Sequence, residues 1–285
     1  MGSSVNIPAF KVEKIFSPTC ELFLSCPHSG KYYPPRLFEL SDLTLQDFHT
    51  FEDAGLNDLI SFASPLGVPY ICGNYGRAWI DLNRHWLELD EHLFSEKLSF
   101  KTIKDSSFVE QGYGLIPSKI SATKPIYKKL LSFKEVQDRI INIYQPYHMM
   151  LETMIQKNII KFNRSVLLDV HSMPVLPEQY WIKGKAPDIV IGTNDGKSCA
   201  PELSKFVYDT LQEIGFNVVL NMPFSGAFTT KYYGQPIKKS HVLQIEISRN
   251  LYWNTETYQR KETFEETRTK ITKFVQNLIG FIKQK

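Results

Sequence analysis

Cysteine is scarce in this sequence, and no cysteine pair has the spacing of a metal site or a disulfide scaffold. The 285 residues contain four cysteines, at positions 20, 26, 72 and 199, and none belongs to a C-x-x-C motif. This pattern argues against a thiolate zinc site and against a disulfide-stabilised secreted protein. We therefore expect a protein of the reducing cytoplasm.

Long apolar runs and a strong charge of one sign are also missing. No apolar run approaches about 18 residues, and residues 1–16 lack a basic start followed by an apolar segment, so we expect neither a membrane span nor a signal peptide. The 33 basic and 30 acidic residues leave a net charge of +3, which gives no reason to expect nucleic acid or a membrane surface as a partner. A small-molecule partner fits this balance, and the oligomeric state is not set by the sequence.

The common nucleotide and serine-nucleophile motifs do not occur. There is no G-x-G-x-x-G after a strand, no G-x-x-x-x-G-K-[ST] and no G-x-S-x-G, which excludes the usual dinucleotide, P-loop and serine-hydrolase sites. Cys26 beside His28 offers a thiol nucleophile, but a small buried cysteine in a strand is the favoured interpretation.

What the sequence does contain is an alternation of short apolar runs with segments of helical spacing. Strands are predicted at 21–26, 68–72, 77–82, 166–170, 179–182, 188–192, 216–220 and 242–247, and helices within 44–63, 133–162, 201–214 and 256–282. Pro146 is expected to kink or split the second helix. Residues 88–124 keep no period and are predicted to be an irregular excursion that could act as an active-site lid. The pattern predicts one α/β domain over residues 1–285, with a mixed twisted sheet flanked by helices.

Two histidines stand where predicted strands end. His28 follows the first strand, and His171 follows the strand at 166–170. If these strands run parallel, both imidazoles face the same edge of the sheet, where open α/β sheets bind ligands. Zinc favours two imidazoles plus a carboxylate, and Asp53 is the candidate third ligand, with Glu52 as the alternative. Two such histidines make a metal site and a structural role about equally favoured.

Basic and acidic residues supply further candidates for chemistry. Arg84, helped by Asn83, could grip a substrate carboxylate, and Arg77 could polarise a carbonyl. A surface ion pair is the alternative for either arginine. Glu246 lies inside an apolar strand, where an unpaired carboxylate would be costly, so it either forms a structural ion pair, for example with Arg249, or acts as an acid and base.

Seven motifs occur in the order in which they occur in N-formylglutamate amidohydrolases, and the chain resembles that family over nearly its whole length. They are S-C-P-H-S-G at 25–30, R-x-x-x-D-L-N-R at 77–84, P-Y-H at 146–148, D-V-H-S at 169–172, D-I-V-I-G-T at 188–193, P-F-S-G at 223–226 and Q-I-E-I at 244–247. The resemblance implies a three-layer fold like that of zinc carboxypeptidases. It also implies hydrolysis of N-formyl-L-glutamate to glutamate and formate.

A more distant similarity to the aspartoacylase and carboxypeptidase group implies roles for the site residues. His28 and His171 are implied as Zn²⁺ ligands, Asn83 and Arg84 as the grip on the α-carboxylate, and Glu246 as the general base. Lys31 stands where that group has a ligand glutamate, so the third ligand comes from elsewhere, and Asp53 remains the hypothesis for it.

Several functional questions stay open at this point. Arg77 is expected to stabilise the oxyanion. The second substrate carboxylate needs another basic group, for which Arg249 and Lys231 are candidates. The alternatives to N-formylglutamate are another amide, such as a peptide or cell-wall fragment met by the lysine-rich stretch 97–129, and a non-catalytic protein that binds an amino acid.

Overall fold

The computed structural model describes residues 7–13, 18–103 and 105–284, so the expectation for residues 1–16 lies largely outside the described residues. The chain divides into two compact units, the first comprising residues 1–11, 27–52 and 72–151 and the second residues 12–26, 53–71 and 152–285. The prediction of one domain stays a prediction. The strands are β1 (Phe10–Glu13), β2 (Leu22–Cys26), β3 (Tyr70–Gly73), β4 (Lys119–Ser121), β5 (Lys124–Pro125), β6 (Ser165–Met173), β7 (Ile189–Gly192), β8 (Val218–Leu220), β9 (Ser240–Ser248), β10 (Trp253–Asn254) and β11 (Gln259–Arg260). The α-helices are α1 (Pro35–Leu40), α2 (Leu45–His49), α3 (Leu56–Leu59), α4 (Ser107–Glu110), α5 (Phe133–Arg139), α6 (Gln145–Phe162), α7 (Pro201–Glu213), α8 (Phe228–Tyr233) and α9 (Phe264–Lys283).

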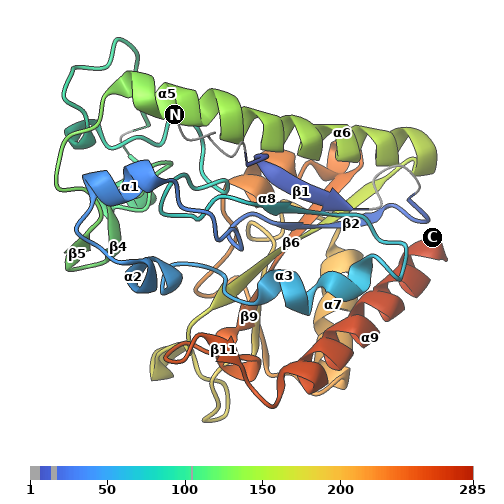
Figure 1. Cartoon of the computed structure of the whole chain (residues 1–285). Coiled ribbons are helices and arrows are strands. Elements are labelled where there is room, and N and C mark those ends of the chain that lie inside the picture. Colours follow the sequence, from blue (N-terminus) through green and yellow to red (C-terminus); the bar gives the residue numbers. More distant parts are fainter. Residues whose placement is uncertain (1–6, 14–17, 104, 285) are drawn as a thin grey trace. The chain divides into compact units, whose positions relative to one another are not determined.

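The main sheet is mixed, as the sequence predicts. Within the described residues its seven strands follow the order β1-β3-β2-β6-β9-β7-β8 (Figure 1). β6 pairs parallel with both β2 and β9, whereas β7 runs antiparallel to β9 and parallel to β8. β2, β6 and β7 are buried along their whole length, which is the pattern of strands covered on both faces.

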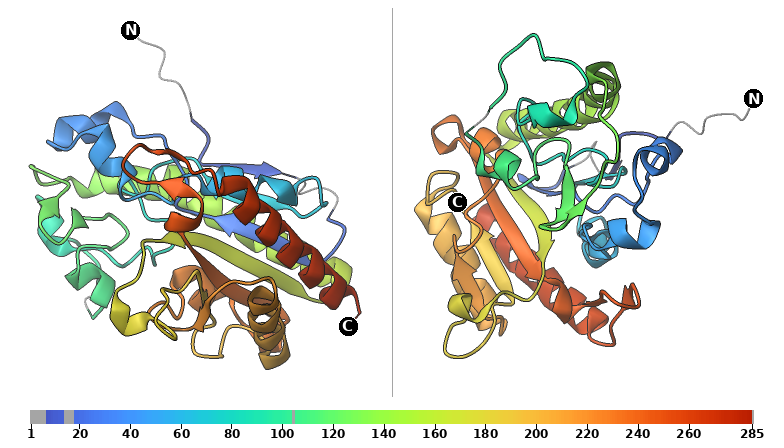
Figure 2. Two further views of the ribbon diagram at one scale, coloured as in Figure 1. Left: turned by 90° about the horizontal axis from the view of Figure 1, so that it is seen from below. Right: turned by 90° about the vertical axis from the view of Figure 1, so that its left-hand side faces the viewer.

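Helices of the second unit cover the sheet. α7 and α9 pack against each other, with the rings of Phe206 and Phe281 stacked at a centroid distance of 4.0 Å. In Figure 2 the C-terminal helix α9 lies on one side of the central strands and α6 on the other. α9 buries one of its faces because apolar side chains recur on that face. Its buried residues are Phe264, Thr267, Ile271, Phe274, Val275, Leu278 and Ile282.

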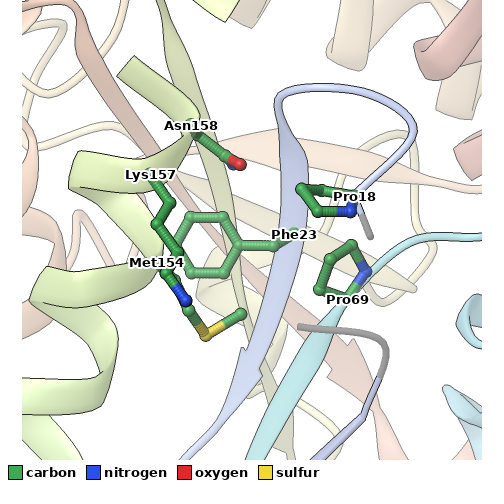
Figure 3. A pocket seen from close by; sticks show the side chains of 6 residues that line it. All are labelled: Pro18, Phe23, Pro69, Met154, Lys157 and Asn158. Carbon is green, nitrogen blue, oxygen red and sulfur yellow. The ribbon is translucent and has the colours of Figure 1, made fainter. Parts of the chain in front are cut away.

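The second half of α6 packs against β2. The side-chain amide of Asn158 donates to the carbonyl of Glu21 at 2.8 Å, and Phe23 points from β2 toward Met154 and Lys157 (Figure 3). The pocket between these side chains has a volume of about 10 Å³, which is no more than one water molecule needs. It is therefore a feature of the packing and not a ligand site.

The long helical run at 133–162 is split, as Pro146 predicts. α5 is followed by a π-helical turn over Ile140–Tyr144, and α6 then starts one residue before Pro146. Proline has no N–H to donate to residue 142, and its ring crowds that carbonyl, so the regular α-helical hydrogen bonds are interrupted in the turn that precedes it. A wider π turn accommodates the missing bond.

The predicted strand at 77–82 is wrong. This segment is a series of turns in which Trp79 N–H donates to the Gly76 carbonyl. The buried side chain of Asp81 accepts the N–H of Asn83 and the Nε–H of Arg77, so local side-chain bonds replace a strand ladder.

Three other segments also differ from the prediction. Residues 179–182 are not a strand, because Glu178–Tyr180 forms a 3₁₀ turn after Pro177. The last helix begins at Phe264, since residues 253–260 form the β10–β11 hairpin, in which the side-chain oxygen of Asn254 accepts two main-chain N–H groups. The segment 44–63 is broken into α2, α3 and a 3₁₀ turn, Ser61–Ala63, because Gly55 adopts a φ of +72°.

The described part of residues 88–124 contains only short elements such as α4 and β4, and the prediction of an active-site lid stays a prediction. Among the described residues, none of the helices combines the length and the apolarity that a bilayer crossing needs. The four cysteines are all buried free thiols.

The packing of α9 makes a prediction for stability. Leu278 is fully buried, so Leu278→Ala should lower the free energy of unfolding by about 2–5 kcal/mol. Gln276 lies on the exposed side of the same helix, and Gln276→Ala should change it by no more than about 0.5 kcal/mol. Urea unfolding measures both, and equal effects of the two substitutions would contradict the placement of α9.

Candidate metal centre and active site

His28 follows β2 after a single intervening residue, so a buried strand fixes where its backbone starts. The turn that follows is held against residues 74–76 by main-chain bonds of Tyr32 to the Asn74 carbonyl and of Gly76 to the Tyr32 carbonyl. A Cβ atom on Gly30 would lie 2.2 Å from the carbonyl oxygen of Tyr75. Only glycine allows this close approach.

The ring of His28 is oriented by a buried carboxylate. Its Nε2 lies 2.7 Å from Oδ1 of Asp81, whose side chain is fully buried. Burial opposes ionisation of Asp81, but the charges of Arg77, Arg84 and His28 outweigh it and hold the pKa of that carboxyl well below its usual range. An ionised carboxylate can only accept, so the Nε2–H of His28 donates to it.

His171 has the same kind of partner. The sequence predicts that His171 follows a strand. In the structure it lies inside β6, because β6 pairs with β9 as far as Met173. Its Nε2 lies 3.0 Å from Oδ2 of Asp169, which is two residues earlier and therefore on the same face of the strand. Its Nδ1 lies 3.2 Å from Oδ2 of Asp53.

Hydroxyl groups hold these two carboxylates in turn. Ser25 donates to Oδ1 of Asp169 at 2.5 Å, directly across from it in the parallel β2–β6 ladder. Ser172 donates to Oδ1 of Asp53 at 2.8 Å. The phenol of Tyr252, fully buried, is close enough to Ser172 and Asp53 for both to act on its pKa, which burial raises.

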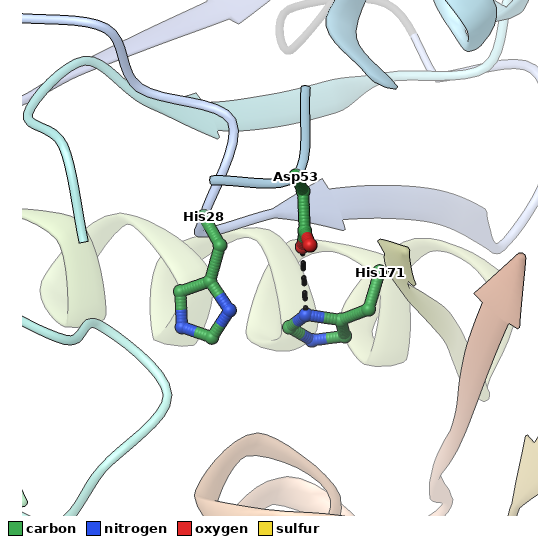
Figure 4. A group of neighbouring side chains, drawn as sticks. All are labelled: His28, Asp53 and His171. Carbon is green, nitrogen blue, oxygen red and sulfur yellow. Dashed lines mark hydrogen bonds and ion pairs between the residues drawn. The ribbon is translucent and has the colours of Figure 1, made fainter. Parts of the chain in front are cut away.

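One nitrogen of His28, one carboxylate oxygen of Asp53 and one nitrogen of His171 lie within 4.8 Å of one another, and all three side chains are buried (Figure 4). Glu52, the alternative third ligand, is buried but does not belong to this group of described residues. Two imidazoles and one carboxylate are the donor set of many catalytic zinc sites, which keep the fourth position open. In such sites the second nitrogen of each histidine is bonded to a carboxylate or carbonyl, as it is here.

The charge around His171 also suits a cation. Burial lowers the pKa of a histidine, but Asp169, Asp53 and Glu246 overcome this effect and raise the pKa of His171 well above its ordinary value. Negative side chains therefore surround this ring in excess. A divalent cation would balance them better than a single proton does.

The arginines predicted to bind substrate are held in place by other groups. Arg77 donates through Nε to Oδ2 of Asp81 at 2.8 Å, and about a fifth of its side chain is exposed. Arg84 is buried, stacks over Phe108 and donates to the carbonyls of Tyr113 and Asn83. Asn83 is buried beside it, and Arg249 is half-buried at the end of β9.

Glu246 lies inside β9, directly opposite His171 in the parallel ladder. Its side chain is buried, and Oε1 accepts a hydrogen bond of 2.8 Å from the side-chain amide of Gln244. Because residues in register share a face, Glu246 and His171 project from the same side of the sheet. The arrangement places a carboxylate next to the candidate metal ligands.

Sequence reasoning missed the residues that orient the ligands. Asp81 and Asp169 belong to the motifs R-x-x-x-D-L-N-R and D-V-H-S, but the sequence analysis assigns no role to either carboxylate. The available signal was the spacing of Asp169 and His171, since two residues apart on a strand means the same face. No sequence signal pointed to Asp81, because its segment was predicted as a strand.

The chain matches the family model described as N-formylglutamate amidohydrolase over residues 20–253. It belongs to the N-formylglutamate amidohydrolase family. It is 28% identical to the N-formylglutamate deformylase of Pseudomonas putida, over 91% of this chain and 92% of that one. The corresponding values for the N-formylglutamate deformylase of Pseudomonas aeruginosa are 26%, 93% and 94%.

A solved structure agrees with this assignment. The crystal structure of N-formylglutamate amidohydrolase from Ralstonia eutropha has a TM-score of 0.90 to this fold at 28% identity, with 98% of this chain and 99% of that chain covered. The chain is therefore an enzyme that hydrolyses a linear amide, and the alternative of a non-catalytic binding protein is set aside.

The partners of the histidines make a prediction for metal affinity. Asp169→Asn keeps the shape of the side chain but removes the charge that orients His171, so we expect the affinity for Zn²⁺ to fall by about 10- to 100-fold. Competition with a chromophoric chelator measures it. Asp188→Asn is the control, because Asp188 accepts the N–H of Asn217 away from this group. Equal affinities of wild type and Asp169→Asn would contradict the role of Asp169.

Proposed function

We propose that the chain hydrolyses N-formyl-L-glutamate to L-glutamate and formate with one Zn²⁺ held by His28, Asp53 and His171. The observation that carries this proposal is that ligand atoms of His28, Asp53 and His171 lie within 4.8 Å of one another, while Nε2 of each histidine faces a buried carboxylate. When bound, zinc supplies a Lewis acid and lowers the pKa of water to roughly 7.

Glu246 would move the protons of the reaction. It accepts a proton from the attacking water while the oxygen of that water adds to the formyl carbon. It then gives this proton to the nitrogen as the carbon–nitrogen bond breaks, which yields the amine of glutamate and formic acid. The acidic proton of formic acid then passes to the amine, so that the final products are formate and glutamate with a protonated amine. The buried position of Glu246 beside Gln244 keeps the carboxylate in one place for both steps.

Basic groups would bind the charges of the substrate. Arg77, with part of its side chain exposed and its Nε fixed on Asp81, is proposed to stabilise the oxyanion that forms on the formyl oxygen. Arg84 and Asn83 are proposed to hold the α-carboxylate, and Arg249 the side-chain carboxylate. In the lysine-rich stretch, Lys124 and Lys128 pair with Asp47 and Asp42, so these two side chains already have acidic partners within the protein.

The substrate and the metal are tested together on the purified protein. Elemental analysis should find one zinc per chain, and N-formyl-L-glutamate should release formate at a rate that falls on chelation and returns with Zn²⁺. A panel of N-formyl and N-acetyl derivatives of glutamate, aspartate and leucine measures the preference for acyl group and side chain. Faster turnover of a neutral derivative than of N-formyl-L-glutamate would overturn the proposed substrate.

Two substitutions separate metal binding from proton transfer. His171→Ala should abolish zinc uptake and leave the fold largely intact, because the loss of one ligand weakens a three-residue site severely. Glu246→Gln should keep the zinc and lower kcat by about 10²- to 10⁴-fold, the usual contribution of a general base. If both variants bind zinc normally and hydrolyse the substrate, the assignment of these residues is wrong.

A further inference from the structure

Gln244 is a buried polar residue that the reaction proposed above does not use. It lies two residues before Glu246 on β9 and therefore on the same face of the sheet. In the sheet it lies between its register partners, Asp169 of β6 and Gly192 of β7. The pair of His171 and Glu246 is the next pair on the same face of the sheet. The position of Gln244 suggests a connection to the site and not to the apolar core.

The amide of Gln244 is fixed at both ends. Its Oε1 accepts the main-chain N–H of Ala227 at 3.0 Å, and its Nε2 donates to Oε1 of Glu246 at 2.8 Å. A main-chain N–H can only donate, so it keeps the amide oxygen on its own side. The NH₂ group is thereby turned toward the carboxylate of Glu246.

The loop that supplies the N–H of Ala227 is itself tied to the end of β7. Asn194 N–H donates to the Ser225 carbonyl, and the side-chain oxygen of Asn221 accepts the N–H and the hydroxyl of Thr193. A Cβ atom on Gly192 would lie 2.9 Å from the nitrogen of Gly226 and the carbonyl carbon of Ser225. The absence of a side chain at Gly192 lets the loop reach Gln244.

We propose that Gln244 is a positioning residue for the general base. The loop 221–227 orients the Gln244 amide, and that amide holds Oε1 of Glu246, so that Oε2 is the oxygen that exchanges protons with water and the leaving amine. This inference rests on the role proposed for Glu246. It assigns a function to the glutamine of the Q-I-E-I motif and to the glycine at the end of β7.

Two substitutions at Gln244 distinguish positioning from mere packing. Gln244→Met keeps the approximate shape and loses both hydrogen bonds, so kcat should fall by about 10- to 100-fold while KM changes by less than about threefold. Gln244→Glu keeps the acceptor for Ala227 but loses the donor to Glu246, and its kcat should fall at least as far. A kcat of Gln244→Glu close to that of the wild type would show that only the loop contact matters and would overturn the proposal.

The dependence on Glu246 is tested by a double-mutant cycle. In the Glu246→Gln background, Gln244→Met should have no further effect on kcat, because the group that it positions is already disabled. Full additivity of the two losses would mean that Gln244 acts elsewhere. Ser240→Ala is the matched control, since Ser240 also donates a buried hydrogen bond from β9, to the Tyr233 carbonyl, at the far end of the strand. It should leave kcat unchanged and zinc content at one per chain.

The loop contact is tested at Gly192. Gly192→Ala should displace residues 224–226 and lower kcat by at least about tenfold, as Gln244→Met does. Gly280→Ala is the control for the change of residue type, because no atom lies within 4 Å of the added methyl group in α9. Unchanged kcat in Gly192→Ala would contradict the contribution of the loop.

A crystal structure of Gln244→Met tests the positioning without any assay. The Glu246 carboxylate should move by more than about 1 Å from its wild-type position, a displacement large enough to matter for catalysis. An unmoved carboxylate would overturn the inference, whatever the substrate is. Failure of the wild type to release formate from N-formyl-L-glutamate would instead contradict the proposed function. The position of the Glu246 carboxylate in Gln244→Met would still test whether Gln244 positions it.

Discussion

Two buried carboxylates determine the orientation of the histidines, and the chemistry of the site depends on that orientation. Asp81 and Asp169 each face Nε2 of one ring, which fixes the orientation of each imidazole. A buried charge is costly unless hydrogen bonds and opposite charges compensate it. Asp81 is compensated by Arg77 and a main-chain N–H, and Asp169 by Ser25. Each of the two histidines is thus oriented by a carboxylate that is itself fixed by hydrogen bonds from other groups.

The register of the central strands carries this arrangement across the sheet. β2, β6 and β9 pair in parallel so that Ser25, Asp169 and Gln244 form one row, and His171 and Glu246 form the next. A shift of one residue in either ladder would send a whole strand's polar side chains to the opposite face. Apolar side chains on the opposite face, such as Leu24, Leu168 and Leu243, are buried in register with one another and oppose such a shift. Packing of the core therefore protects the geometry of the site.

The periodicity of the sequence was enough to predict the strands of the sheet centre and the two histidines, because fully buried strands are short apolar runs with clear ends. It failed where side chains replace main-chain partners. The segment of Arg77 and Asp81 has the composition of a strand, but its hydrogen bonds go to the Asp81 carboxylate. The contact of this carboxylate with His28 joins residues 53 positions apart. No local pattern records it, and the same holds for Asp53, which meets His171 across 118 positions.

The excess of negative charge around His171 connects the stability of the fold with its function. Asp53, Asp169 and Glu246 all act on this one ring, and a protonated imidazole neutralises only part of their charge. A divalent cation bound at this group would offset more of that charge than a proton does. A ligand that binds only the folded state stabilises it by an amount that grows with its concentration. The same charges that a packed core disfavours are thus those that a bound cation would compensate, and Glu246, one of them, lies opposite His171 in the ladder.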